Sequence, residues 1–82
     1  MKTNTRTYVR KFAVLEKDIN IRSYHSGVLS ELNLTGGDRV SIDGKTNYYT
    51  EDGDLMLGLN GRHHRISRSG FRPEVETDTV DV

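Results

Sequence analysis

The sequence contains no cysteine and no tryptophan, and its single proline, Pro73, lies near the C-terminal end. Without cysteine, neither a disulfide framework nor a thiolate zinc site stabilises the fold. Hydrophobic residues make up only 33% of the chain, and no apolar run reaches the length of a signal peptide or a membrane span. These absences predict a soluble, cytoplasmic protein that has no membrane segment.

The 82 residues suffice for one small domain, whose core stabilises it only marginally. Oligomerisation is a reasonable additional source of stability. We place the β-rich domain at residues 1–73. Because residues 74–82 carry four acids, no base and no apolar periodicity, they are expected to form a flexible acidic tail.

The net charge is zero, but charges of each sign are segregated along the chain. Residues 1–11 carry four basic residues and no acid, and residues 60–73 carry four arginines, two histidines and no acid. Such blocks are typical of surface patches that select a partner, and equally of acids that neutralise basic neighbours. Both interpretations stay open at this point.

Residues 39–67 show the clearest pattern, that of a four-strand antiparallel meander. Asp52-Gly53 and Asn60-Gly61 are typical of two-residue hairpin turns, and Asp43-Gly44-Lys45 suits a three-residue loop. Pairing the strands about these turns gives one mainly apolar face and one mainly polar face. The predicted apolar face consists of Val40, Ile42, Thr46, Tyr48, Thr50, Leu55, Leu57, Leu59, His64 and Ile66.

Upstream of the meander, residues 7–15 and 18–22 have strand propensity. The stretch "SGVLSELNL" changes period and predicts a short helix, with Ser26 as its N-cap and Thr35-Gly36-Gly37 as its end. The predicted fold class is therefore mainly β, a small antiparallel meander or barrel with one short helix.

The stretch "VLSELNLTGGDRVSID", followed by "EDGDLMLGL", resembles the swapped-hairpin DNA-binding fold of the AbrB and MazE families. The likeness covers residues 19–59. Leu32, Leu34, Gly37, Asp38 and Val40 match the family's turn into a strand. The family's proline after the first strand is absent, because Arg22 stands there.

This resemblance implies a homodimer whose hairpins present basic residues to DNA, acting as a transcription regulator or antitoxin. The alternative is an SH3-like barrel that binds and modulates a partner protein, as an inhibitor encoded by a phage or mobile element does. A weaker alternative is an RNA-binding barrel.

Enzymatic and metal chemistry find little support in the sequence. Adjacent strand residues point to opposite faces, so His63 and His64 do not easily share one metal ion. Asp52-Gly53-Asp54 lacks the ligand pattern of a calcium loop, and no pairing of nucleophile with base is evident. We therefore expect a binding protein with no cofactor and no metal.

The candidate contact residues combine guanidinium and ammonium groups, which bind phosphate or carboxylate, with aromatic side chains enriched at interfaces. They are expected to contact DNA or a partner protein. These residues are Arg10, Lys11, Arg22, Arg62, Arg65, Arg68, Arg72, Tyr49 and Phe71.

Overall fold

The computed structural model describes residues 4–81, and this part of the chain forms eight β-strands and one 3₁₀ turn. The mainly β fold expected from the sequence is confirmed. In chain order the elements are β1 (Thr5–Leu15), β2 (Ile19–His25), β3 (Val28–Leu34), β4 (Arg39–Ser41), β5 (Asn47–Tyr49), β6 (Leu55–Leu59), β7 (Arg62–Ile66), η1 (Arg68–Gly70) and β8 (Phe71–Asp81).

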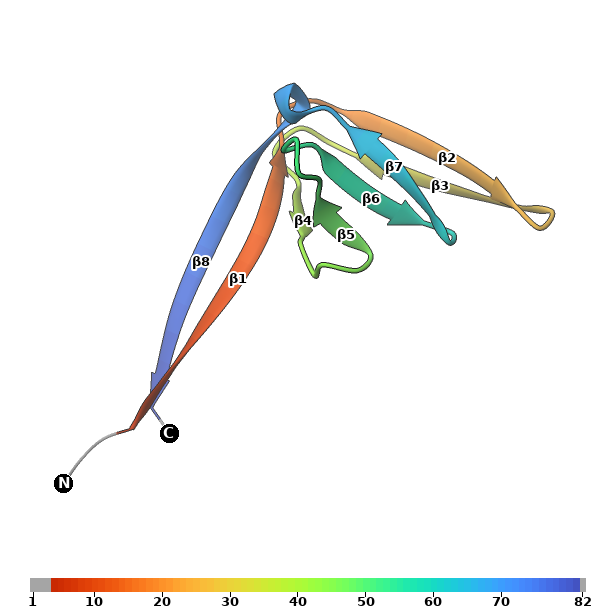
Figure 1. The fold of residues 1–82 in the computed structure, drawn as a ribbon. Coiled ribbons are helices and arrows are strands. Elements are labelled where there is room, and N and C mark those ends of the chain that lie inside the picture. The colour runs from red at the N-terminus through yellow and green to blue at the C-terminus, as the bar shows by residue number, and fades with distance from the viewer. Residues whose placement is uncertain (1–3, 82) are drawn as a thin grey trace.

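The strands form three small antiparallel sheets, with the orders β4-β1-β8, β2-β3 and β5-β6-β7. Figure 1 shows that β1 and β8 make a long ribbon leading away from the other strands, while the β2-β3 hairpin extends to the opposite side. The described residues measure 60 × 29 × 24 Å along their principal axes. Two β-ribbons therefore project from a small central body.

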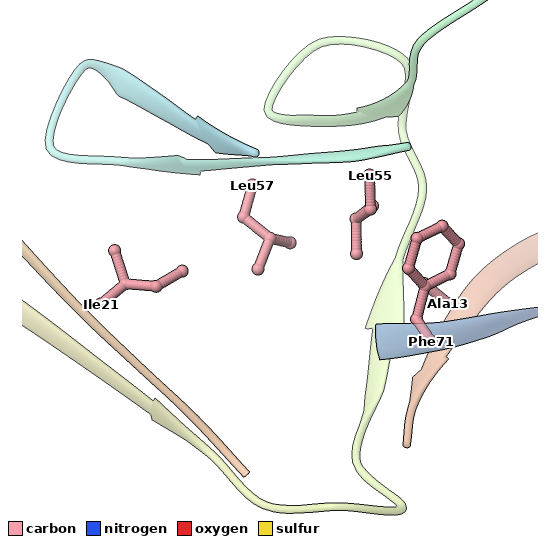
Figure 2. Packing of buried hydrophobic residues seen from close by; sticks show 5 residues of the cluster. All are labelled: Ala13, Ile21, Leu55, Leu57 and Phe71. Carbon is pink, nitrogen blue, oxygen red and sulfur yellow. The ribbon is translucent and has the colours of Figure 1, made fainter. Parts of the chain in front are cut away.

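The core lies where the three sheets meet. Leu55 and Leu57 of β6 face Ile21 of β2, and Ala13 and Phe71 close the cluster from the base of the β1-β8 ribbon (Figure 2). All five side chains are buried. Burial of each of the larger ones contributes about 1.5–3 kcal/mol to the stability of the fold. Partly buried apolar residues surround them: Ile19, Leu32, Leu34, Val40, Ile42, Tyr49, Leu59 and Ile66.

The β6-β7 hairpin has the register that its turn predicts. Asn60 and Gly61 adopt positive φ angles of 53° and 76°, as a two-residue turn with both central positions left-handed requires. Leu57 then lies opposite His64, and Leu55 lies opposite Ile66. The predicted core face of these two strands is confirmed.

The side chains of strand β5 point to the opposite faces of the sheet from those predicted. The Thr50 and Asp54 backbones pair across a three-residue loop, in which Gly53 has φ 87°, so the loop is one residue longer than the predicted Asp52-Gly53 turn. A slip of one residue turns every side chain of a strand to its other face. Tyr49 is consequently opposite Leu55 on the core side, and Tyr48 is opposite Met56.

The first strand of the predicted meander pairs elsewhere. Strand β4 pairs with β1, with Val40 opposite Ala13, and does not join β5 in a sheet. The intervening loop is held instead by Asp43, whose Oδ1 accepts the amide N–H groups of Lys45, Thr46 and Asn47 at 2.8–3.0 Å. Those hydrogen bonds fix a loop conformation that does not continue the ladder.

The predicted helix at residues 26–34 is wrong, because this segment forms β3. Ser26 and Gly27 make a hairpin turn at φ 53° and 78°, rather than a helix cap. Leu32 and Leu34 alternate toward the core, where they lie opposite Ile21 and Ile19 of β2. Burial against this partner strand outweighs a helix of about two turns, which has little stability by itself.

The predicted flexible tail is also wrong for the residues described. Residues 74–81 belong to β8, which pairs with β1 without interruption from Phe71 opposite Leu15 to Asp81 opposite Thr5. Pro73 is tolerated because β8 is an edge strand of its sheet. Val82, at the end of the predicted tail, lies outside the described residues.

Candidate functional site

Several of the predicted contact arginines are paired with acids within the chain. The nearest nitrogen–oxygen distances are 2.8 Å for Arg65 to Asp54, 3.7 Å for Arg72 to Glu16, 3.8 Å for Arg22 to Glu31, and 3.9 Å for Arg10 to Asp78. These pairs lie at the surface, where each contributes about 0–1 kcal/mol. They nevertheless reduce the positive charge that these arginines present to a ligand.

Asp54 gathers two of the predicted residues around one carboxylate. It accepts a hydrogen bond from the Arg65 guanidinium at 2.8 Å and one from the Arg68 backbone N–H at 3.0 Å. The hydrogen bond from Arg65, followed by the one from Arg68, lowers the pKa of Asp54 below its ordinary value. The contacts tie β7 and η1 to the loop before β6, so the Arg65 side chain and the Arg68 backbone have a structural role.

Lys11, Arg62 and Arg68 have exposed positions, as a binding role requires. They do not form one patch, since Lys11 belongs to β1 while Arg62 begins β7. Arg62 and His63 line a shallow hollow together with Lys45. The arginines of residues 60–73 have different surroundings, since Arg62 lines this hollow, Arg65 pairs with Asp54 and Arg72 pairs with Glu16.

Tyr49 and Phe71 are not the exposed aromatic contacts that were expected. Phe71 is only 6% exposed, and its ring stacks on that of Tyr49 with the centroids 5.7 Å apart and the planes 15° apart. The Tyr49 hydroxyl donates a hydrogen bond to the Phe12 carbonyl at 2.9 Å, and burial raises the pKa of Tyr49. The pair joins β5 to the base of the β1-β8 ribbon.

The two histidines point to opposite faces of β7, as predicted. His63 packs against Tyr48 at a centroid distance of 5.2 Å, and its Nε2 is 3.2 Å from the Lys45 carbonyl. His64 lies opposite Leu57 on the core side, and its buried Nε2 has no hydrogen-bond partner among the described residues. In the described part of the chain, no three His, Asp or Glu side chains are grouped in a way that could hold a metal ion.

Arg39 forms a charged cluster that the sequence did not indicate. Its guanidinium lies 2.7 Å from Glu76 and 3.2 Å from Glu74 of β8, and its Cζ lies 4.0 Å above the centroid of the Phe12 ring. The acidic C-terminal segment thus neutralises a basic residue that is 37 positions away from Glu76 in the sequence. Only the pairing of β1 with both β4 and β8 makes this contact available.

Three large apolar side chains are exposed together at the end of the β2-β3 hairpin. Tyr24, Val28 and Leu29 are 65%, 57% and 57% exposed, and they flank the Ser26-Gly27 turn. We call residues 24–29 the hairpin tip. Because the sequence predicted a helix here, with Val28 and Leu29 on its apolar face, it gave no sign of this exposure.

The outer part of the β1-β8 ribbon is likewise unpacked. We call residues 5–11 and 75–81 the arm. All of residues 5–11 are exposed, and Val9 and Val75 expose 57% and 60% of their surfaces. A two-stranded ribbon without further packing is marginally stable in water, so an arm of this kind is typical of a segment that contacts another molecule.

Fold and surface together define a small all-β protein with two projecting ribbons and an internally neutralised body. Comparison with protein-family models, with curated proteins and with solved structures finds no match for this chain. The resemblance to the AbrB and MazE families thus stays a prediction. In the residues described, no helix is long and apolar enough to cross a membrane.

Proposed function

We propose that this protein is a non-enzymatic binding module that docks on a partner protein through the hairpin tip. The observation that carries the proposal is the exposure of Tyr24, Val28 and Leu29 at the end of a projecting hairpin. The Val28 carbonyl accepts a hydrogen bond from the Asn60 side chain at 3.3 Å, but the apolar side chains of Tyr24, Val28 and Leu29 remain mostly in water, where they stabilise nothing in the fold. Exposed apolar groups gathered in one place are typical of interaction sites.

The arrangement of the tip suits insertion into an apolar groove. Tyr24 and Leu29 are cross-strand partners and share one face, whereas Val28 lies opposite His25 on the other face. A partner that encloses the tip would therefore bury apolar surface on both sides. Tyrosine is among the residues that contribute most to binding when they become fully enclosed.

Binding to duplex DNA, as a regulator or antitoxin of the AbrB and MazE type, is the second candidate. Arg62 and Lys45 favour it, because they line one hollow and could contact phosphate. The ion pairs of Arg22, Arg65 and Arg72 with acids and the zero net charge speak against it, since most nucleic-acid domains are clearly basic.

A pair of matched variants tests the tip. Tyr24→Ser with Leu29→Ser removes the cross-strand apolar pair, and Asn20→Ser with Asn33→Ser changes the polar cross-strand pair on the same face of the same hairpin. Each full-length chain is used as bait in an extract of its own cells, and bound proteins are quantified by mass spectrometry. We expect one partner to be captured by the wild type and by the asparagine variant, and to be lost from the tip variant.

Equal capture by the tip variant would refute docking through the tip. Fluorescence anisotropy with short duplex DNA tests the second candidate on the same proteins. Binding that falls steeply with salt, and that weakens when Arg65 and Arg68 are both changed to glutamate, would favour the DNA-binding regulator instead.

A further inference from the structure

The arm has two strand edges, and no other strand among residues 4–81 pairs with residues 5–10 of β1 or with residues 75–81 of β8 on their outer sides. Strands β1 and β8 pair in a continuous register with no bulge, and β8 has no second neighbour in its sheet. On the other side, β4 and the following Ile42 cover β1 only from Lys11 to Val14, which leaves residues 5–10 open. Natural proteins usually shield such edges with bulges, prolines, a covering loop or charged side chains, and of these the described arm has only the charged side chains.

The backbone hydrogen bonds show which groups these edges offer. The Lys11 carbonyl accepts a hydrogen bond from the Ile42 amide N–H at 2.9 Å. The backbone N–H and C=O groups of Lys11 therefore point away from β8. The direction of the backbone N–H and C=O groups alternates from one residue to the next along an antiparallel strand. The backbone groups of Thr5, Thr7 and Val9 therefore also point outward, away from β8. In β8 the outward residues are the partners of these positions, Thr77, Thr79 and Asp81, together with Val75 opposite Lys11.

Pro73 agrees with this assignment. Pro73 is four residues before Thr77, so its backbone faces the same outward side. It lies opposite Ala13, whose backbone groups also face away from β8. A proline has no N–H to donate, so it is tolerated in a strand where that position faces away from the neighbouring strand. The outward amides of Val75, Thr77 and Thr79 thus lack partners within the chain's β1-β8 ladder.

The two strands of the arm carry opposite formal charges, and within the chain Arg10 pairs with Asp78 while Glu76 pairs with Arg39. The β1 part of the arm has a charge of +3 and no acid, and the β8 part has a charge of −3 and no base. Pairing of β1 with a second β1, or of β8 with a second β8, would bring like charges together. The charged residues are Arg6, Arg10 and Lys11 in the first segment, and Glu76, Asp78 and Asp81 in the second.

We propose that the arm joins copies of this chain head to tail, the β1 edge of one copy pairing antiparallel with the β8 edge of the next. In this pairing the outward residues of β1 would lie opposite the outward residues of β8 in the next copy. The side chains of Arg6 and Arg10 would then lie on the same face of the sheet as those of Glu76 and Asp78 of the next copy. The face with Val9 and Val75 would become continuous as well. Each arm would thereby gain the additional strands that an isolated two-stranded ribbon lacks.

Such a contact uses two different edges, so every copy still has one free edge of each kind after pairing. Heterologous contacts of this type close into a ring or continue as a filament, depending on the rotation between copies. Since β8 runs antiparallel to both its own β1 and the next one, all arms would project in the same direction. The assembly is thus a row of arms that extends one antiparallel sheet.

Thr77→Pro tests the proposal by removing an outward N–H without touching the bonds between β1 and β8. Thr77→Val is the matched control, because it keeps the N–H and also suits a strand. We expect sedimentation velocity to show assemblies larger than the 9.3 kDa chain for the wild type and for Thr77→Val, and a monomer for Thr77→Pro. Circular dichroism verifies that each variant is folded.

Amide hydrogen exchange on the wild type tests the same contact without a substitution. The Val75, Thr77 and Thr79 amides should exchange slowly at high protein concentration and quickly at low concentration. A wild type that stays monomeric at high concentration, or a folded Thr77→Pro variant that assembles like the wild type, would overturn the proposal. The Tyr24→Ser with Leu29→Ser variant should assemble normally, so this proposal and docking through the hairpin tip can fail separately.

Discussion

Replacement of Gly58 by alanine should destabilise the protein through one backbone contact. Gly58 lies in β6 opposite His63, and a Cβ added there would lie 2.6 Å from the Thr46 carbonyl oxygen and 2.9 Å from Thr46 Cγ2. An ordinary contact begins near 3.4 Å, so the loop would have to retreat by about 0.8 Å. The sequence around Gly58 shows only a glycine within a strand.

The loop has little freedom to retreat, because both of its sides are held. Asp43 accepts three amide N–H groups from residues 45–47, and the Gly58 amide donates to Asn47 Oδ1 at 3.2 Å. Overpacking against a fixed neighbour costs about 1–3 kcal/mol. For a chain of this size, that loss lowers the melting temperature by roughly 5–20 °C.

Thermal and urea unfolding of Gly58→Ala beside Gly36→Ala measures this effect. Gly36 is the matched control, since its φ is not left-handed and an added Cβ would meet its nearest atom at 3.5 Å. Gly36→Ala should be neutral or should stabilise the fold by up to about 1 kcal/mol. If Gly58→Ala were as stable as Gly36→Ala, the loop would be free to move and the reasoning would be refuted.

Three further substitutions address the core and the charged contacts, each measured by urea unfolding. Leu57→Ala empties a fully buried position and should cost about 2–5 kcal/mol, whereas a loss under about 1 kcal/mol would contradict a packed core. Tyr49→Phe keeps the ring stack but removes the hydrogen bond to the Phe12 carbonyl, so it should cost about 1 kcal/mol, and no loss would indicate that the bond is not formed. The pKa of Asp54 is lowered in the folded protein. The ionised carboxylate therefore stabilises the fold at pH values above its ordinary pKa of 3.8, and this stabilisation is lost as the pH falls through the lowered pKa. Asp54→Asn should therefore be less stable than the wild type at neutral pH and should lose less stability on acidification, and parallel pH profiles would contradict this assignment.

Local chemistry made part of the fold predictable. The Asn60-Gly61 turn fixed the β6-β7 register, because few residue pairs adopt two left-handed conformations in succession. Asp52-Gly53 was predicted as a turn equally well, but its loop is one residue longer. That single residue reversed β5 and placed Tyr49 in the core.

Two other errors, the helix at residues 26–34 and the flexible tail, share a cause, which is that a partner strand outside the segment decided its structure. Val28, Leu29 and Leu32 fit a short helix as well as a strand, and pairing of the segment with Ile19 and Ile21 decided for the strand. Residues 74–81 show no pattern of their own, yet β1 supplies the partner that makes them a strand. Consequently neither the exposed apolar residues of the hairpin tip nor the strand pairing of the arm was predicted from the sequence.

The sequence by itself determined that this is a small, mainly β protein with segregated charges, because composition, turn residues and charge blocks are local properties. It also determined that His63 and His64 face opposite ways, since side chains alternate in any strand. Only the tertiary structure decided which charges neutralise one another and which remain at an open edge. That outcome depends on β1 pairing with β4 on one side and β8 on the other, over separations that no local pattern reports.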